Sequence, residues 1–150
     1  MKRTFKTVLV ILVPVIVMAF FEMDAFGQEW TAVQKEVWEL EEARWKAYLQ
    51  VVIEGGYLKH YREDGSFWPY WSDEPLSLIK YKEGVLQRAG GAFNVELTPL
   101  SIKVFGDVAI LQYNYKLATF GGTIYAKVTS ARVKKDGVWQ VIGHMYSKMN

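Results

Sequence analysis

The stretch that decides the fold is FGDVAILQYNYKLATFGGTIYAKVTSARVKKDGVW, residues 105–139. Short turn sequences, each containing glycine, separate long runs that are rich in β-branched and aromatic residues. This pattern predicts strands at 108–120, 123–134 and 138–147, with a fourth strand before them at 95–105. Because the connecting turns are short, consecutive strands are antiparallel neighbours in one sheet.

The sequence before this stretch has the periodicity of helices. Apolar residues recur every three or four positions over 29–54, which predicts a long helix that ends at Gly55-Gly56. One more helical turn and then a polar turn are expected over 57–66. A second helix begins within 72–75 and ends near Arg88. Helices followed by an antiparallel sheet predict an α+β fold in which the helices pack on one face of the sheet.

Apolar residues occupy both faces of the predicted sheet. In the strand at 108–120, alternation places one apolar set on a single face: Ala109, Leu111, Tyr113, Tyr115 and Leu117. In the strand at 138–147, Trp139, Val141 and Met145 alternate with a second set, which is Val138, Ile142, His144 and Tyr146. One face must pack on the helices, so we expect the other face to bind a second copy of the chain in a homodimer.

Composition limits the class of protein. The chain has 150 residues, the size of one domain, and is 51% hydrophobic and 15% aromatic, which excludes a disordered or low-complexity protein. Its net charge is only +2 and its basic residues form no concentrated patch, so no nucleic-acid partner is expected. The absence of cysteine excludes disulfides, a thiol nucleophile and a Cys-ligated metal.

The first 27 residues have the pattern of a signal peptide. Basic residues within 2–6 precede an uncharged apolar run at 7–21, and small residues at positions 25 and 27 precede a cleavage site expected before Gln28. The run is shorter than the about 20 residues of a spanning helix, and an uncleaved N-terminal anchor is the alternative. We therefore expect a secreted or periplasmic domain at 28–150, which contacts a membrane only if that segment stays attached.

Several short segments carry a family resemblance through their order along the chain. They are Val37-Trp38 through Trp45, Tyr61-Arg62-Glu63-Asp64, Phe105-Gly106-Asp107-Val108, and Asp136-Gly137-Val138-Trp139 with His144 and Ser147. Together they resemble the nuclear-transport-factor-2-like (NTF2-like) superfamily, in particular its SnoaL-like branch, over essentially 28–150. The resemblance implies a cystatin-like cone, as in ketosteroid-isomerase-like proteins, in which N-terminal helices pack on a curved antiparallel sheet around a pocket for a small apolar or amphipathic molecule. It does not fix a reaction, because the superfamily includes isomerases, dehydratases and cyclases as well as non-catalytic domains.

Asp64 and His144 are the candidate catalytic residues. Asp64 follows the short helical turn, where relatives have an acidic residue, and would act as a base; otherwise it is a turn-former that bonds its own backbone. His144 lies late in the last strand as an acid/base candidate, with a core histidine as the alternative, and His60 is the only other histidine. An isomerase, dehydratase or cyclase mechanism requires Asp64 or His144 inside the cone, with a tyrosine within hydrogen-bonding reach.

Aromatic residues and one arginine are the candidate pocket-lining residues. The set is Trp45, Tyr61, Trp68, Tyr70, Tyr113, Tyr115 and Arg132. Arg132 shares its strand face with apolar side chains, so it must be paired, hold an anionic ligand or, as a strand-end residue, reach solvent. No glycine-rich phosphate loop or metal-binding motif is present, so no cofactor and no metal is expected. The sequence thus favours a domain that binds a small apolar or amphipathic molecule. The alternatives are an isomerase, dehydratase or cyclase that uses Asp64 or His144 as its acid or base, and a non-catalytic dimeric assembly domain.

Overall fold

The computed structural model describes residues 29–149, in which two α-helices and a short π-helix accompany a five-stranded sheet. The elements are, in chain order, α1 (Ala32–Leu49), η1 (Ile53–Tyr57), β1 (Tyr61–Trp68), α2 (Leu78–Arg88), β2 (Ala92–Phe105), β3 (Val108–Thr119), β4 (Gly122–Lys135) and β5 (Val138–Lys148). The signal peptide expected at 1–27, or the anchor that is its alternative, lies outside the described residues. No helix within 29–149 has the length and apolar character needed to cross a membrane.

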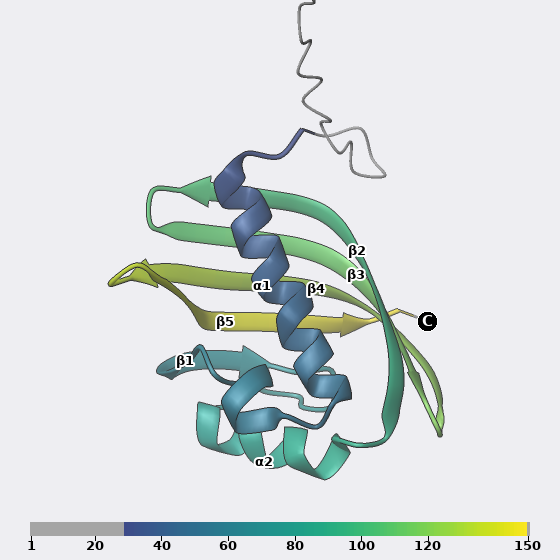
Figure 1. Cartoon of the computed structure of the whole chain (residues 1–150). Helices are drawn as coiled ribbons and strands as arrows, with labels where there is room; N and C mark the ends of the chain where they lie inside the picture. The colour runs from purple at the N-terminus through teal and green to yellow at the C-terminus, as the bar shows by residue number, and fades with distance from the viewer. Residues whose placement is uncertain (1–28, 150) are drawn as a thin grey trace, which may run out of the picture.

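The sheet is curved and carries α1 across one of its faces (Figure 1). Its strand order is β1-β5-β4-β3-β2, and the strands β2 to β5 form the predicted antiparallel meander. The strand β1 joins the edge of this meander and runs parallel to β5, so the sheet is mixed rather than wholly antiparallel. The prediction of an α+β fold with helices on a curved sheet is confirmed.

The edge strand β1 replaces the polar turn that was expected before Phe67. Its residues are mostly polar because an edge strand has one neighbour and one side open to water. The buried residues of this strand are Tyr61 and Phe67; Phe67 is fully buried and pairs with His144 on β5. Phe67 also exchanges two backbone hydrogen bonds with Leu76, at 3.0 and 2.7 Å, which hold Leu76 extended. The second helix therefore begins after Ser77, later than predicted.

The helix α1 is shorter than the predicted 29–54 because the chain changes conformation after Leu49. Thr31 caps its start, and the side chain of Gln34 completes a capping box. Beyond its end Val51 has a φ of 60°, and the chain then forms the π-helical turn η1. Gly56 in this turn passes so close to α1 that a Cβ atom there would lie 2.6 Å from the Cβ of Ala47.

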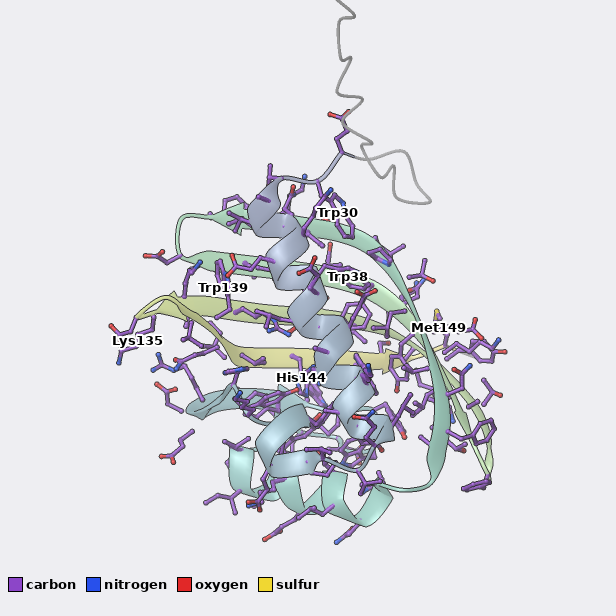
Figure 2. The ribbon with its side chains drawn as sticks, viewed as in Figure 1. Trp30, Trp38, Lys135, Trp139, His144 and Met149 are labelled. Atoms are coloured by element: carbon purple, nitrogen blue, oxygen red, sulfur yellow. The ribbon has the colours of Figure 1, made fainter. Side chains whose placement is uncertain are left out.

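The face of the sheet beneath α1 holds the core. The alternation predicted for β3 is confirmed, since its whole apolar set is buried: Ala109, Leu111, Tyr113, Tyr115 and Leu117. The alternation predicted for β5 is wrong after Val141, because a bulge places Arg132 opposite Val141 and Ala131 opposite Gly143. The extra residue, Ile142, moves His144 to the same buried face as Trp139; Figure 2 shows both residues on β5, beyond the turn at Lys135.

Candidate functional site

Two charged residues of α1 are buried beneath the helix. Glu41 and Arg44 lie three positions apart on the buried stripe of α1, so both side chains reach toward the sheet. Arg44 donates from Nε and Nη2 to Glu41 Oε1, with 3.1 Å between Nε and Oε1. Arg132, which is buried on β4, donates from Nη2 to the other oxygen, Oε2. One carboxylate therefore binds two guanidinium groups in the interior, and we call Glu41, Arg44 and Arg132, with the tyrosines that contact them, the ion cluster.

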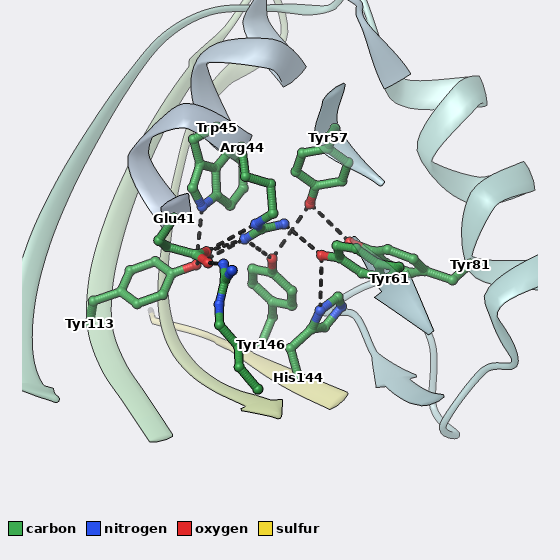
Figure 3. A network of polar contacts seen from close by, with 10 residues as sticks. Glu41, Arg44, Trp45, Tyr57, Tyr61, Tyr81, Tyr113, His144 and Tyr146 are labelled. Atoms are coloured by element: carbon green, nitrogen blue, oxygen red, sulfur yellow. Dashed lines mark hydrogen bonds and ion pairs between the residues drawn. The ribbon is translucent and has the colours of Figure 1, made fainter. Parts of the chain in front are cut away.

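Tyrosine hydroxyls surround the Arg44 guanidinium (Figure 3). Nη1 donates to Tyr61 Oη at 2.7 Å, while Nη2 lies 3.1 Å from Tyr113 Oη and 3.2 Å from Tyr146 Oη. Tyr113 in turn donates to Glu41 Oε1 at 2.5 Å. These hydroxyls take the place of water around the buried ions, which lowers the cost of burying them.

The carboxyl group of Glu41 is held in its ionised form. Burial alone raises its pKa, but attraction to Arg44 and Arg132 and hydrogen bonds from Arg44 and Tyr113 outweigh burial and hold the pKa well below its usual range. Such a carboxylate takes up no proton near neutral pH. Glu41 therefore serves as a structural anion and not as a general base.

The buried charges of this cluster do not balance. Within residues 29–149, the buried acidic and arginine side chains are Glu41, Arg44 and Arg132, so two positive charges face one negative charge. In addition, Arg132 Nε is buried and has no hydrogen-bond partner. Buried ions are normally paired and fully hydrogen-bonded. This part of the interior thus holds one positive charge and one N–H donor that the described residues leave unsatisfied.

A cavity of about 270 Å³, which we call the arginine pocket, lies beside the cluster. Its wall combines apolar side chains, two tyrosines and several cationic or titratable groups, and the lining residues are Leu40, Ala43, Arg44, Gly56, Tyr57, Lys59, His60, Tyr61, Arg132 and Val141. Lys59 is exposed and His60 is half-buried at the turn after η1. Burial, and then the charges of Lys59 and Arg132, lower the pKa of His60. The pocket therefore offers a ligand both an apolar wall and a cationic wall.

On the other side of Tyr57, aromatic rings fill most of the interior. We call this region the aromatic end. It surrounds a space of only about 20 Å³, lined by Trp45, Tyr48, Tyr57, Tyr70, Trp71, Tyr81, Val85, Tyr115, Leu117 and Tyr146. The rings of Trp45 and Tyr115 lie 5.0 Å apart, and the hydroxyls of Tyr57 and Tyr81 lie 2.9 Å apart. Such a space has room for about one water molecule.

The structure divides the predicted pocket-lining residues among four places: the arginine pocket, the aromatic end, the ion cluster and the surface. Tyr61 and Arg132 line the arginine pocket, whereas Trp45, Tyr70 and Tyr115 line the small space of the aromatic end. Tyr113 is fully buried in the ion cluster.

Trp68 differs from expectation, because it is 40% exposed and its indole donates to the backbone oxygen of Ser72 at 2.9 Å. The strand β1 alternates its side chains, so burial of Phe67 turns Trp68 outward.

His144 lies in the interior as a neutral, enclosed side chain. The rings of Tyr61, Phe67, Tyr81 and Tyr146 surround it. Its Nδ1 lies 3.3 Å from Tyr61 Oη, and its buried Nε2 has no hydrogen-bond partner. Burial and the charge of Arg44 lower the pKa of His144 well below its usual value. It lines neither the arginine pocket nor the space at the aromatic end.

Asp64 lies on the surface, away from both cavities. Its side chain is 68% exposed and accepts hydrogen bonds from Arg62 Nε at 2.7 Å and Nη2 at 2.5 Å. The hydrogen bonds from Arg62 lower the pKa of Asp64. Its place differs from the expected one because the segment is an edge strand and not the end of a helical turn. Asp64 thus does not meet the requirement for a base inside the cone.

The sequence-based reasoning missed both charged residues that α1 contributes to the ion cluster. Glu41 and Arg44 were absent from the candidates, although both occur within the apolar stripe of the predicted helix, where a charged pair at (i, i+3) is a visible signal. Tyr57 and Tyr146 were missed because their places depend on η1 and on the bulge in β5. Within residues 29–149, no group of three or more His, Asp or Glu side chains is arranged to hold a metal ion.

Comparison with known proteins shows the fold. No family model and no curated protein matches the sequence. Among solved structures, the chain is similar to a ketosteroid isomerase-like protein from Erwinia carotovora atroseptica, with a TM-score of 0.67, 13% identity, and coverage of 81% of this chain and 99% of that one.

Two further solved structures agree with this match. One is an NTF2-like protein of unknown function from Pseudomonas putida, with a TM-score of 0.64, 17% identity and coverage of 79% and 87% of the two chains. The other is a protein of unknown function with a cystatin-like fold from Nostoc punctiforme, with a TM-score of 0.61, 18% identity and coverage of 81% and 96%. The SnoaL-like branch stays a prediction. The chain has a cystatin-like fold similar to that of NTF2-like proteins, as its sequence motifs predict.

Proposed function

We propose that the protein binds a small amphipathic molecule in the arginine pocket, and that it does so outside the cytoplasm. The observation that carries the binding function is a cavity of about 270 Å³ whose wall joins apolar side chains such as Leu40 and Val141 to hydrogen-bonding groups of Tyr61 and Arg132. Ligand sites in proteins combine these two kinds of surface. The extracytoplasmic location is supported by the basic and apolar pattern of residues 1–27.

The geometry favours binding over catalysis. An isomerase, dehydratase or cyclase needs a group that exchanges a proton with the substrate. Glu41 is held ionised by two guanidinium groups, His144 is enclosed by rings, and Asp64 faces solvent. The observation that keeps an enzyme as the second candidate is His60, which lines the pocket and titrates below its usual pKa.

Ligand-observed NMR with a panel of small aromatic and alicyclic acids, amides and alcohols tests the binding function. Ala43 is exposed on α1 and lines the pocket, so Ala43→Trp covers the cavity without disturbing the core. We expect saturation-transfer signals for some members with the wild type and their loss with Ala43→Trp. The matched control is Lys46→Trp, an exposed position on the same helix that does not line the pocket. If no signal depends on position 43, the proposed function is wrong.

We further propose that a second copy of the chain covers the outer face of the sheet. This face carries a hollow of about 300 Å³, where Leu100 is 52% exposed and Met145 is 48% exposed. Sedimentation equilibrium tests the dimer: Met145→Glu is expected to give a monomer. Ile79→Glu on α2, where the wild-type side chain is 73% exposed, is expected to leave the dimer unchanged.

A further inference from the structure

Arg132 belongs both to the ion cluster, whose charges do not balance, and to the wall of the arginine pocket. This residue is 1% exposed, and its Nη2 binds Glu41 while its Nε has no partner. The same side chain forms part of the pocket wall. A buried guanidinium that lines a cavity and keeps one N–H donor without a partner among the described residues can bind an anionic oxygen.

The remaining wall of the pocket is cationic as well. Arg44 lines it from α1, and Lys59 lies exposed at its rim. None of the ten residues that line the pocket in the described part of the chain is acidic, and the nearby carboxylate of Glu41 is already bound by both arginines. An anion that enters this pocket therefore meets attraction from three cations and no competing carboxylate on the wall.

We propose that the ligand of the arginine pocket is a small monocarboxylic acid whose carboxylate binds the guanidinium of Arg132. This inference rests on the proposed binding function and names its ligand class. One carboxylate supplies the single negative charge that balances Arg44 and Arg132 against Glu41. A phosphate group brings more negative charge than the cluster lacks. The apolar body of the acid packs on Leu40 and Val141, and the volume of about 270 Å³ lies at the small end of ligand sites, which limits the acid to a compact one.

The test is an NMR titration of the full chain with benzoate, its neutral isostere benzamide, and phenyl phosphate. We expect benzoate to bind the wild type about 10-fold or more tightly than benzamide, because only benzoate offers a charged acceptor to the guanidinium. Benzoate is also expected to bind more tightly than phenyl phosphate.

Variants locate the binding group. Arg132→Gln is expected to lower the affinity for benzoate to that for benzamide, whereas Arg132→Lys keeps part of the preference. Lys59 is exposed and its side chain makes no contact within the ion cluster. Lys59→Gln is therefore expected to weaken the binding of benzoate a few-fold and to leave the binding of benzamide unchanged. Lys46→Gln, which does not line the pocket, is the control and changes neither. If Arg132→Gln does not fold, the wild-type preference and Lys59→Gln decide.

The outcomes separate this inference from the function on which it rests. Equal affinities for benzoate and benzamide would overturn the proposal that the ligand is a carboxylic acid, and would leave the proposed binding of a small molecule intact. Tighter binding of phenyl phosphate overturns the preference for a single charge. Binding of benzoate that Arg132→Gln and Lys59→Gln both leave unchanged shows that the acid lies elsewhere. If none of the three probes binds, the carboxylic-acid proposal is wrong, and the ligand panel with Ala43→Trp decides by itself whether the arginine pocket is a ligand site.

Discussion

The aromatic end and the arginine pocket lie on two sides of Tyr57, in one interior, and they are packed to different degrees. At the aromatic end, rings leave a space of about 20 Å³, whereas about 270 Å³ stays open beside Arg44 and Arg132. Flat rings interlock at many angles and fill space efficiently. Guanidinium and carboxylate groups must keep their hydrogen-bond directions, so they cannot pack as freely. Volume for a ligand is left where the charge is, and not where the aromatic residues are.

The largest expected effect comes from removing the anion that holds the pocket side together. Glu41→Gln leaves Arg44 and Arg132 buried without a counter-charge, which is expected to lower the free energy of unfolding by about 3–5 kcal/mol. Urea denaturation followed by circular dichroism measures the loss.

The matched control for Glu41→Gln is the half-exposed pair of Glu36 with Lys134 on the same helix and strand. Glu36→Gln is expected to change stability by less than about 0.5 kcal/mol. Equal effects of the two substitutions would mean that the buried cluster does not support this side of the interior.

The strands of the sheet differ in how well the sequence predicts them. Strands β2 to β5 and the buried set on β3 follow from local alternation and turn residues, which is why their predicted bounds lie close to the observed ones. The strand β1 could not be predicted in this way, since its hydrogen bonds are to β5, about 80 residues away, and its edge position removes the apolar alternation.

The site was harder to predict than the fold for two physical reasons. The bulge at Ile142 changes which face His144 occupies, and alternation alone cannot reveal one extra residue. The pair of Glu41 and Arg132 joins residues 91 positions apart, so no local pattern links them. For Arg132 the sequence left two alternatives, a cation with a partner or ligand and a strand-end residue in solvent; the structure shows the buried, paired cation, and a charge on an apolar strand face was the signal for it.

Gly56 tests whether the close approach of η1 to α1 builds the wall of the arginine pocket. A Cβ atom at this position would lie 2.6 Å from the Cβ of Ala47, so Gly56→Ala forces η1 away from the helix. We expect a loss of about 2 kcal/mol in unfolding free energy, measured by urea denaturation. Gly55→Ala is the matched control, since nothing lies within 4 Å of a Cβ atom there. A loss of equal size at Gly55 would show that the cost comes from glycine's flexibility in η1 and not from this contact.

His144 adjoins both regions, because it contacts Tyr61, which lines the arginine pocket, and Tyr81, which lines the aromatic end. Its pKa in the folded state is well below the usual value, so as the pH falls below about 6.5 the unfolded chain takes up a proton that the folded chain refuses. Stability is therefore full above pH 7.5 and falls by up to about 1.4 kcal/mol for each pH unit below 6.5. Urea denaturation between pH 5.5 and 7.5 measures this slope.

Two variants assign that slope to one histidine. His144→Gln is expected to flatten it, whereas His60→Gln, at a partly exposed position, is expected to keep most of it. A slope that His60→Gln removes and His144→Gln retains would place the titrating group at the rim of the arginine pocket instead of at its border with the aromatic end.

The smallest expected effect is a gain in stability at the entrance to η1. Val51 has a φ of 60°, a conformation that a β-branched residue adopts only at a cost, and its side chain is 51% exposed. Val51→Asn is expected to raise the free energy of unfolding by about 1 kcal/mol, because asparagine tolerates the left-handed region. Val52→Asn is the control: Val52 is 47% exposed with a φ of −87°, so no gain is expected there. The affinity of Val51→Asn for benzoate is compared with that of the wild type. Equal affinities would show that the backbone strain at Val51 is not needed to keep the arginine pocket open.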